Sequence, residues 1–449
     1  MQKQVNLTEG SVVPTLLRFT FPILLSILLQ TTYGTVDLLI VGQFSTIEET
    51  SAVTIGSQIM QTVTQLFTGL SLGTTILIGK YIGAEEHKKT TAVIGVSIVL
   101  FFFLALIGTA FLTIFKGAIA TAMNTPEESF EQTKNYLFVC GIGTMFIVFY
   151  NLIGSVFRGI GDAKTPLLTV FIACIVNIVL DIVLIAVFDL GATGAAIATT
   201  TAQATSVVLS LLIIKKKTLP FTFTKKDLHY SDSICKKILK LGIPVALQGV
   251  LVSVSFLAIT AIVNGFGVYA SAAVGIVEKA TGLILIVPIS FMQSLSAFAA
   301  QNIGAAKLER AKNGLFWAIV FSLIFGCFTA YIAMFHGTLL TRIFTNDPET
   351  TVFALSYLKS YAFDCIFVAA MFSFSGYFNG CGHTTFVMLQ SVLAAFFIRI
   401  PLAYLFSTFE NTSLFLIGMS TPISTFFQII ACVIFYMHLI KKEKCTLAL

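Results

Sequence analysis

Long apolar stretches separated by short polar segments set the pattern of this chain. Windows such as 93–115, 136–157 and 315–335 hold about 20 residues without a formal charge, enough for a helix to cross roughly 30 Å of hydrocarbon. These stretches are apolar all round, which predicts helices rather than the alternating strands of a membrane barrel. About twelve helices are expected, near residues 15–43, 52–80, 91–115, 135–157, 166–188, 192–214, 238–264, 270–300, 314–337, 352–378, 386–408 and 414–438.

The composition narrows the class of protein. Of the 449 residues 56% are hydrophobic and only 11% are charged, whereas soluble domains carry about a quarter charged residues. A soluble enzyme of this length is therefore excluded, and the chain is predicted to be an all-α polytopic membrane protein. The polar first 13 residues indicate a cytoplasmic lead-in rather than a cleaved signal peptide. The eight cysteines are scattered along the chain without metal-ligand spacing, so we expect them to serve as packing residues.

Basic residues favour one side of the predicted membrane. Lys88/Lys89, Lys215–Lys217 and Lys225/Lys226 fall on the side that holds both termini, whereas the opposite loops are acidic, as at Glu127/Glu128. The positive-inside rule then places both termini in the cytoplasm, with the chain in the cell's inner or plasma membrane. The net charge of +6 follows from this topology and from contact with anionic lipids, and does not indicate nucleic acid.

The two halves of the chain repeat. Sliding the second half back over the first brings Pro244 onto Pro22 and Tyr357 onto Tyr136, and sets NDPET at 346–350 against NTPEE at 124–128. Because each half has six spans, both halves start on the same side, so the repeats are parallel. The predicted division is an N-lobe at 1–214, a cytoplasmic linker at 215–237 that acts as a hinge, and a C-lobe at 238–449. A cavity between two such lobes is typical of transporters.

A few charged residues lie inside the predicted spans, where each costs at least a few kcal/mol. In the second half two acids accompany two bases, so mutual pairing is the first expectation. In the first half neither acid has an intramembrane base, so both are expected to hold a proton or bind a cation. The six residues are Asp37, Asp181, Glu278, Lys279, Asp364 and Arg399.

Asp37 and Asp181 are predicted to share one pocket. Each lies about seven residues, roughly 10 Å, from the outer end of its helix. Asn177 is one turn before Asp181 on the same face, and Thr199 reaches the same depth, so both are expected to hydrogen-bond the carboxylates. The alternative is that Asn177, Asp181 and Thr199 only join helices through polar contacts.

Gln58, Gln61, Gln65 and Thr68 lie three or four residues apart on one helix face. This stripe fits the wall of a wet cavity, and equally fits hydrogen bonding between helices. Prolines in or near spans predict kinks, since each removes a backbone hydrogen bond. They are Pro22, Pro244, Pro288 and Pro401, and Pro22 is also a candidate for gating.

Enzyme signatures are absent from the sequence. It has no P-loop, no GxSxG and no HExxH, and its five histidines are dispersed. We therefore expect no enzymatic activity, no catalytic residue, no metal and no cofactor beyond a coupling ion. ATP is excluded as the direct source of energy.

Two segments are the most distinctive: RGIGDAKTP at 158–166, followed by NIVLD at 177–181. With these segments, KYIGAEEHKK at 80–89 and AQNIGAAKLERAK at 300–312, the chain resembles the multidrug and toxic compound extrusion (MATE) transporters over essentially its whole length. The resemblance implies twelve helices in two lobes around a V-shaped cavity. It also implies export of mostly cationic amphipathic compounds in exchange for H⁺ or Na⁺ by alternating access.

The resemblance also implies roles for single residues. Asp37, Asn177, Asp181 and Thr199 look like the N-lobe cation and proton site of the DinF-like branch, and Pro22 resembles the helix-1 proline whose bending accompanies protonation. The second half departs from NorM-like members, since Gln248 stands where they place an acid, and their other acid would align near Val368 rather than at Asp364. The candidates for the substrate cavity are Gln58, Gln61, Gln65, Gln248, Glu278 and Asp364.

Two other functions stay open. A flippase for lipid-linked precursors, from the same superfamily, would need unpaired bases in its cavity for an anionic cargo, and only Lys279 and Arg399 qualify. An uncoupled channel or scaffold is the other alternative, although embedded acids in a two-fold repeat argue against it. The expected partners are small-molecule cations and membrane lipids, with a monomer as the default.

Overall fold

The structure is a computed structural model that describes residues 6–217, 219, 221–224, 227–345, 347–410 and 412–447. Within these ranges every regular element is a helix. Eleven of the helices are long and apolar enough to span a membrane, and a bent pair of helices provides a further span. The prediction of an all-α membrane protein with about twelve spans is therefore confirmed.

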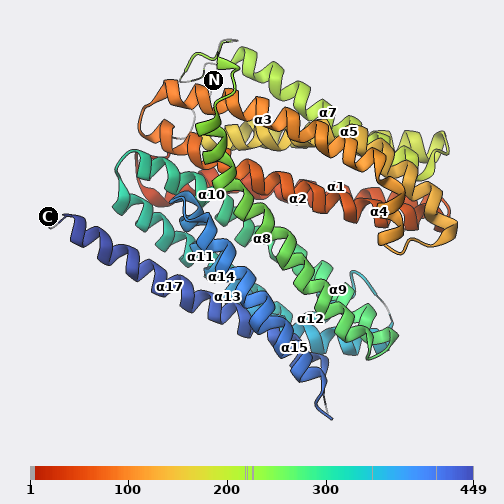
Figure 1. Cartoon of the computed structure of the whole chain (residues 1–449). Coiled ribbons are helices and arrows are strands. Elements are labelled where there is room, and N and C mark those ends of the chain that lie inside the picture. The colour runs from red at the N-terminus through yellow and green to blue at the C-terminus, as the bar shows by residue number, and fades with distance from the viewer. Residues whose placement is uncertain are drawn as a thin grey trace. The chain divides into compact units, whose positions relative to one another are not determined.

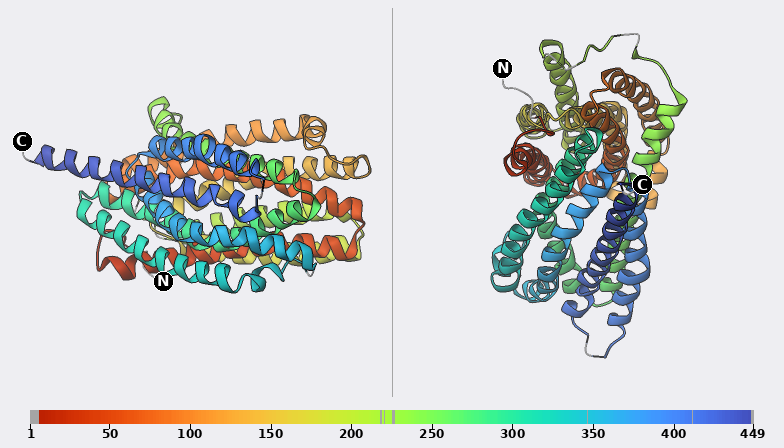
Figure 2. Two further views of the ribbon diagram at one scale, coloured as in Figure 1. Left: turned by 90° about the horizontal axis from the view of Figure 1, so that it is seen from below. Right: turned by 90° about the vertical axis from the view of Figure 1, so that its left-hand side faces the viewer.

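The chain divides into two compact units. Unit 1 runs to Ala246 and also includes Ala300–Leu308. Its long helices lie lengthwise beside one another, with α5 packed against α2, α3 and α7 (Figures 1 and 2). Its elements are α1 (Val12–Phe44), α2 (Ile47–Gly83), α3 (His87–Ile114), α4 (Lys116–Ala122), α5 (Glu127–Gly159), α6 (Lys164–Asp181), the π-helix η1 (Ile182–Val187) and α7 (Gly191–Lys216).

Unit 2 comprises Leu247–Ala299 and the chain from Glu309 onward. Here α13 packs against α9 and α17, so each unit is built around the helix that carries the matching tyrosine, Tyr136 or Tyr357. The predicted limits of the two lobes, 1–214 and 238–449, stay predictions. The boundary between the two units falls within α8, which begins in unit 1 and ends in unit 2. The elements are α8 (Asp232–Asn264), α9 (Val268–Ile284), α10 (Ile286–Gly304), α11 (Leu308–Phe335), α12 (Gly337–Thr341), α13 (Pro348–Gly380), α14 (Thr384–Ala394), the π-helix η3 (Ala395–Arg399), α15 (Ile400–Ser407), α16 (Leu414–Gly418) and α17 (Ser420–Leu447).

Most helices are longer than predicted. The helix expected at 52–80 is α2, which begins at Ile47 and ends at Gly83. Its first turn contains Glu48 and Glu49, and the Thr46 hydroxyl caps it by accepting a hydrogen bond from the Glu49 amide at 3.3 Å. Hydropathy detects only the part of a helix inside hydrocarbon, whereas the helix continues until a cap ends it, so the predicted limits were wrong by several residues.

The helix predicted at 270–300 is not one straight helix. It is divided into α9 and α10, which meet at a bend of 43°. Pro288 follows the break and has no amide hydrogen to donate to the carbonyl group of Ile284, four residues earlier. The loss of that bond accounts for the bend, in line with the kink expected from Pro288, whereas Pro22 and Pro244 lie inside unbroken helices.

The described residues of the 215–237 linker belong to unit 1. Phe221 and Phe223 pack against its hydrophobic core. A Cβ on Gly95 of α3 would lie 1.8 Å from the carbonyl oxygen of Asp227, so glycine is required for this contact. Hydrogen bonds from the Thr224 amide and hydroxyl hold the pKa of the Asp227 carboxyl below its usual range. Four linker residues, Thr218, Pro220, Lys225 and Lys226, lie outside the described residues, as does Asn346 of the NDPET match.

Candidate functional site

Unit 1 brings together the four residues predicted to form its cation and proton site. Asp37 lies on α1, Asn177 and Asp181 on α6, and Thr199 on α7, and these three helices pack against one another. Asn177 and Asp181 are completely buried, and Asp37 is 7% exposed. The Thr199 hydroxyl donates to Asp37 Oδ2 at 3.1 Å, and Asp181 and Asn177 lie beside the same carboxylate. We call these four residues the N-unit site.

The N-unit site holds more hydrogen-bonding capacity than its protein partners use. Asp37 Oδ1, both carboxylate oxygens of Asp181 and both polar side-chain atoms of Asn177 have no hydrogen-bond partner among the described residues. Within the same part of the chain, neither acid forms an ion pair with a lysine or arginine. Since a buried, unpaired carboxylate is costly, this arrangement favours uptake of a proton or a cation.

The backbone at Asp181 is irregular. The α-helical part of α6 ends at Asp181, and η1 follows directly. A π-helix changes the register of the side chains that follow it, and such segments often occur at functional sites. The local sequence gives no physical account of why η1 forms at this position.

Three further residues surround the site, and the sequence analysis did not predict them as part of it. They are Tyr33, Tyr136 and Gln203. Gln203 Nε2 donates to the Tyr33 hydroxyl at 3.1 Å, and Tyr136 of α5 lies close enough to act electrostatically with both acids. Tyr33 is one turn before Asp37, and Gln203 is one turn after Thr199. The one-turn spacing was therefore a usable signal.

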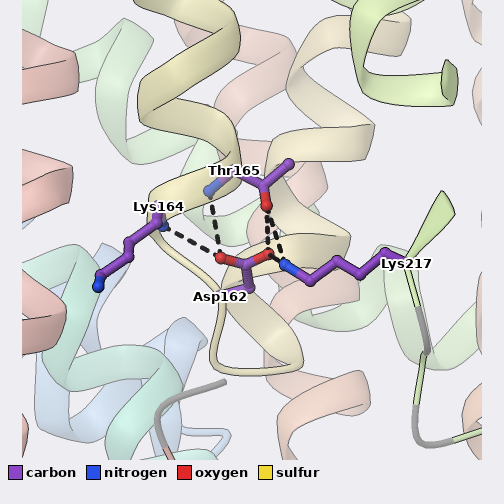
Figure 3. Close-up of polar contacts among 4 residues, drawn as sticks. All are labelled: Asp162, Lys164, Thr165 and Lys217. Atoms are coloured by element: carbon purple, nitrogen blue, oxygen red, sulfur yellow. Dashed lines mark hydrogen bonds and ion pairs between the residues drawn. The ribbon is translucent and has the colours of Figure 1, made fainter. Parts of the chain in front are cut away.

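Asp162, within the RGIGDAKTP segment, connects the start of α6 to the end of α7 (Figure 3). Its Oδ1 accepts hydrogen bonds from the amides of Lys164 and Thr165, each at 3.1 Å. Its Oδ2 accepts from the Thr165 hydroxyl at 2.5 Å and pairs with the Lys217 ammonium group. Gly161 allows the turn that presents this carboxylate, with φ of 85°. The motif thus fixes the helix that carries Asn177 and Asp181.

The polar stripe of α2 divides between the two expected roles. Gln58, Gln61 and Gln65 are exposed, and their part in a substrate cavity stays a prediction. The Thr68 hydroxyl instead donates to Asn151 Oδ1 of α5 at 2.8 Å, so it joins helices. Pro22 is buried in α1, where its carbonyl oxygen accepts a hydrogen bond from Ser26 at 2.8 Å.

The candidates in unit 2 lie in different surroundings. Gln248 Nε2 donates to the Ser391 hydroxyl at 2.9 Å and so joins α8 to α14. Glu278 is half-buried and accepts from the Thr260 hydroxyl at 3.3 Å, whereas Lys279 is exposed. Asp364 is 7% exposed and Arg399 is 5% exposed.

Two units of membrane-spanning helices, one with a buried acid pair, define a multi-pass membrane transporter. A family model described as MatE matches residues 22–183 and 244–405, in the same register as the Pro22 and Pro244 repeat. The chain belongs to the MatE family, whose members are transporters and not enzymes.

Full-length similarity extends to curated proteins and to a solved structure. The chain is 27% identical over 437 residues to the Probable multidrug resistance protein YpnP of Bacillus subtilis, covering 97% of both chains. It is 23% identical to the FAD transporter of Shewanella oneidensis, covering 100% of this chain and 99% of that protein. The fold matches the "Outward-facing conformation of a multidrug resistance MATE family transporter of the MOP superfamily" with a TM-score of 0.91, at 21% identity and 99% coverage of both chains.

Proposed function

We propose that this protein is a multidrug efflux antiporter, which exports cationic amphipathic compounds in exchange for H⁺ or Na⁺ by alternating access. The observation that carries the proposal is the buried, unpaired acid pair of Asp37 and Asp181 in unit 1. The names of several relatives, including the Multidrug export protein MepA of Staphylococcus haemolyticus, support the substrate class.

Charge explains how the exchange operates. When Asp37 and Asp181 are ionised, they attract cations into unit 1, and a cationic substrate gains from this field while an anion is repelled. Uptake of H⁺ or Na⁺ neutralises the pair and removes that attraction, which favours release of the substrate. The empty carrier then resets. The Thr199 hydroxyl and the Asn177 amide provide ligands of the kind that tune such an exchange.

Pro22 connects the ion site to a helix that can bend. Pro22 and Asp37 lie on the same helix, α1, and Pro22 removes one backbone hydrogen bond from it. We propose that neutralising Asp37 changes the bend at Pro22, and that this bend gates the pathway.

The proposed contacts for substrate are Glu278, Asp364 and the glutamines at 58, 61, 65 and 248. We also propose that the protein resides in the inner or plasma membrane with both termini in the cytoplasm, and that the coupling ion is its only cofactor.

The test is efflux of a fluorescent lipophilic cation from proteoliposomes, with a pH gradient and a sodium gradient imposed separately. Wild-type protein is expected to transport in response to one of the two gradients, which identifies the ion. Asp37→Asn keeps the shape of the side chain but removes its charge, so it should reduce transport to the rate of protein-free vesicles. Wild-type transport by both Asp37→Asn and Asp181→Asn would contradict the proposal.

A second cargo is suggested by the FAD transporter relative. FAD is anionic, so it would need a cationic group at its binding site rather than the acid pair of unit 1. Loading the same proteoliposomes with FAD distinguishes the two cargoes. Export of FAD without gradient-driven export of the lipophilic cation would favour this second function.

A further inference from the structure

Two distinctive segments, KYIGAEEHKK at 80–89 and AQNIGAAKLERAK at 300–312, have no part in the proposed exchange of ions. Each ends a helix with the same turn. After α2 the backbone turns at Glu85, with φ of 59°, and after α10 it turns at Ala306, with φ of 56°. In each turn an amide donates to the carbonyl oxygen five residues earlier, at 2.9 Å and 2.7 Å. The two turns are therefore equivalent members of the repeat.

The two turns contact each other through their glycines. A Cβ on Gly83 would lie 1.9 Å from the carbonyl oxygen of Gln301, and a Cβ on Gly304 would lie 2.0 Å from the carbonyl oxygen of Lys80. The contact is reciprocal, since Lys80 and Gln301 each come three residues before the glycine of their own turn. Only glycine allows two helix ends to approach this closely. The repeat thus forms a self-complementary backbone contact.

Two side chains at the end of α10 add to the contact of the second turn with unit 1. Gln301 and Asn302 are both buried. Gln301 Nε2 donates to the carbonyl oxygen of Gly159, where α5 ends, at 2.8 Å. Asn302 Nδ2 donates to the carbonyl oxygen of Leu7 at 3.1 Å. Because a buried amide that loses its hydrogen bond is costly, these bonds stabilise the position of the turn.

The chain just before α1 binds to the same turn, and we call residues 6–8 the N-terminal strap. Leu7 is completely buried, and its carbonyl group is the one that accepts from Asn302. The next carbonyl group, of Thr8, accepts from Lys307 Nζ at 3.0 Å. The Thr8 amide and hydroxyl donate to Asn6 Oδ1 at 3.0 Å and 2.8 Å, which fixes the strap in a turn of its own. The strap is thus joined to the second turn at two successive carbonyl groups.

The second turn, residues 300–308, belongs to unit 1, although the chain on both sides of it belongs to unit 2. Alternating access requires the two units to move relative to one another. The helix α8 also passes from one unit to the other, and it has Pro244 and Gly249 beside that passage, where it can bend. In contrast, α10 has no proline or glycine between Pro288 and Gly304. Movement of unit 2 is therefore expected to draw residues 300–308 out of unit 1.

We propose that residues 300–308 are a latch, which leaves unit 1 each time the carrier changes the side to which it is open, and that the N-terminal strap holds this latch closed. The inference rests on the proposed alternating access, and it identifies contacts that must break in each cycle. The strap leads directly into α1, the helix that carries Pro22 and Asp37. A change in the bend of α1 therefore moves the strap, which links the N-unit site to the latch.

The first test measures opening of the latch in proteoliposomes. Ala300 is completely buried in a cluster with Leu72 and Ile76 of α2, so the thiol of Ala300→Cys reacts with N-ethylmaleimide only after the latch has left. The matched control is Ala192→Cys, at an equally buried position near the start of α7. Mass spectrometry of the labelled peptides gives both rates. We expect Ala300→Cys to react at least about tenfold faster, since opening of a local segment costs less than opening of the core of unit 1.

The role of the N-terminal strap is tested in the same assay. Leu7→Ala truncates a side chain that is 0% exposed, whereas Leu17→Ala removes the same atoms from a side chain of α1 that is 37% exposed. Because truncation of a fully buried leucine destabilises its contacts far more, Leu7→Ala should raise the reaction rate of Ala300→Cys by about tenfold or more. Leu17→Ala should leave that rate unchanged. Equal rates with Leu7→Ala and Leu17→Ala would overturn the role of the strap.

The second test fixes the latch in its closed position. Lys80→Cys and Ala305→Cys, on either side of the glycine contact, are combined and joined by a short reducible cross-linker. We expect the cross-linked protein to export the lipophilic cation no faster than protein-free vesicles, and to recover when the cross-link is reduced. Each single substitution, treated with the same reagent, controls for reaction at native thiols and should transport like wild-type protein.

Each outcome decides a specific point. Wild-type efflux by the cross-linked protein would overturn the latch, as would equal reaction rates of Ala300→Cys and Ala192→Cys. Absence of gradient-driven efflux in the protein without substitutions would contradict the proposed function instead. In that case the reaction rates with N-ethylmaleimide still test the latch, because they do not depend on transport.

Discussion

The two units place buried charge at different positions of the same repeat. In unit 1, Asp37 and Asp181 are both buried, and neither forms an ion pair with a base among the described residues. In unit 2, the register of Pro22 and Pro244 sets the buried Arg399 at the position of Asn177, and the apolar Ile259 and Ala403 at the positions of the two acids. Hydroxyl groups line both places, from Thr199 in one unit and from Thr421 in the other. The repeated fold sets where polar side chains gather, and the identity of one or two residues sets the charge at that place.

The same contrast exists where α6 and α14 begin. Asp162 caps α6 and pairs with Lys217, whereas the matching residue before α14 is His383, which forms no side-chain cap. The His383 ring instead contacts the ring of Phe435, with the centroids 5.3 Å apart. Unit 1 therefore fixes its helix with charge, and unit 2 fixes the corresponding helix with aromatic packing.

The largest expected effect comes from transferring the charge of unit 2 into unit 1. Asn177→Arg places a guanidinium one turn before Asp181, where it would act as a permanent counter-cation. We expect gradient-driven efflux to fall to the rate of protein-free vesicles while the protein still inserts. The measurement is efflux in proteoliposomes alongside the amount of folded protein.

Asn177→Gln is the matched control for this substitution, since it lengthens the side chain without adding charge. It should transport more than Asn177→Arg. Equal loss in both variants would show that size rather than charge matters at this position.

A smaller effect is expected from the helix starts. Asp162→Ala removes a helix cap and leaves Lys217 without its partner, so the free energy of unfolding should fall by about 2–4 kcal/mol. His383→Ala removes one aromatic contact, so it should cost only about 1 kcal/mol. Thermal unfolding in detergent compares the two variants. A larger loss of thermal stability in His383→Ala than in Asp162→Ala would contradict the view that charge fixes the start of α6 more strongly than aromatic packing fixes the start of α14.

Much of the N-unit site could be predicted because its signals are local. Asp37 and Asp181 stand out as acids in apolar spans without a base, and Asn177 lies one turn from Asp181. Counting residues from the outer ends of the predicted helices then placed side chains that are far apart in the sequence at the same depth in the membrane. The order of spans followed from hydropathy, and the bend near Pro288 followed from its missing amide hydrogen.

Other features depend on packing that a sequence pattern does not carry. The π-helices at 182–187 and 395–399 have no local signature in the sequence. In the second half, the sequence offered Lys279 and Arg399 as equal partners for the two acids. The structure separates the two bases by burial, since Lys279 is exposed and Arg399 is buried.

The most direct test of the central claim is to neutralise each unit in turn and measure gradient-driven efflux of the lipophilic cation. One protein carries Asp37→Asn with Asp181→Asn, and the other carries Asp364→Asn with Arg399→Gln. The first should lose gradient-driven transport altogether, because the N-unit site is proposed to exchange the coupling ion, whereas the second should bind substrate more weakly and still transport in response to the gradient. Retained transport in the first protein, or complete loss in a well-folded second protein, would contradict the account.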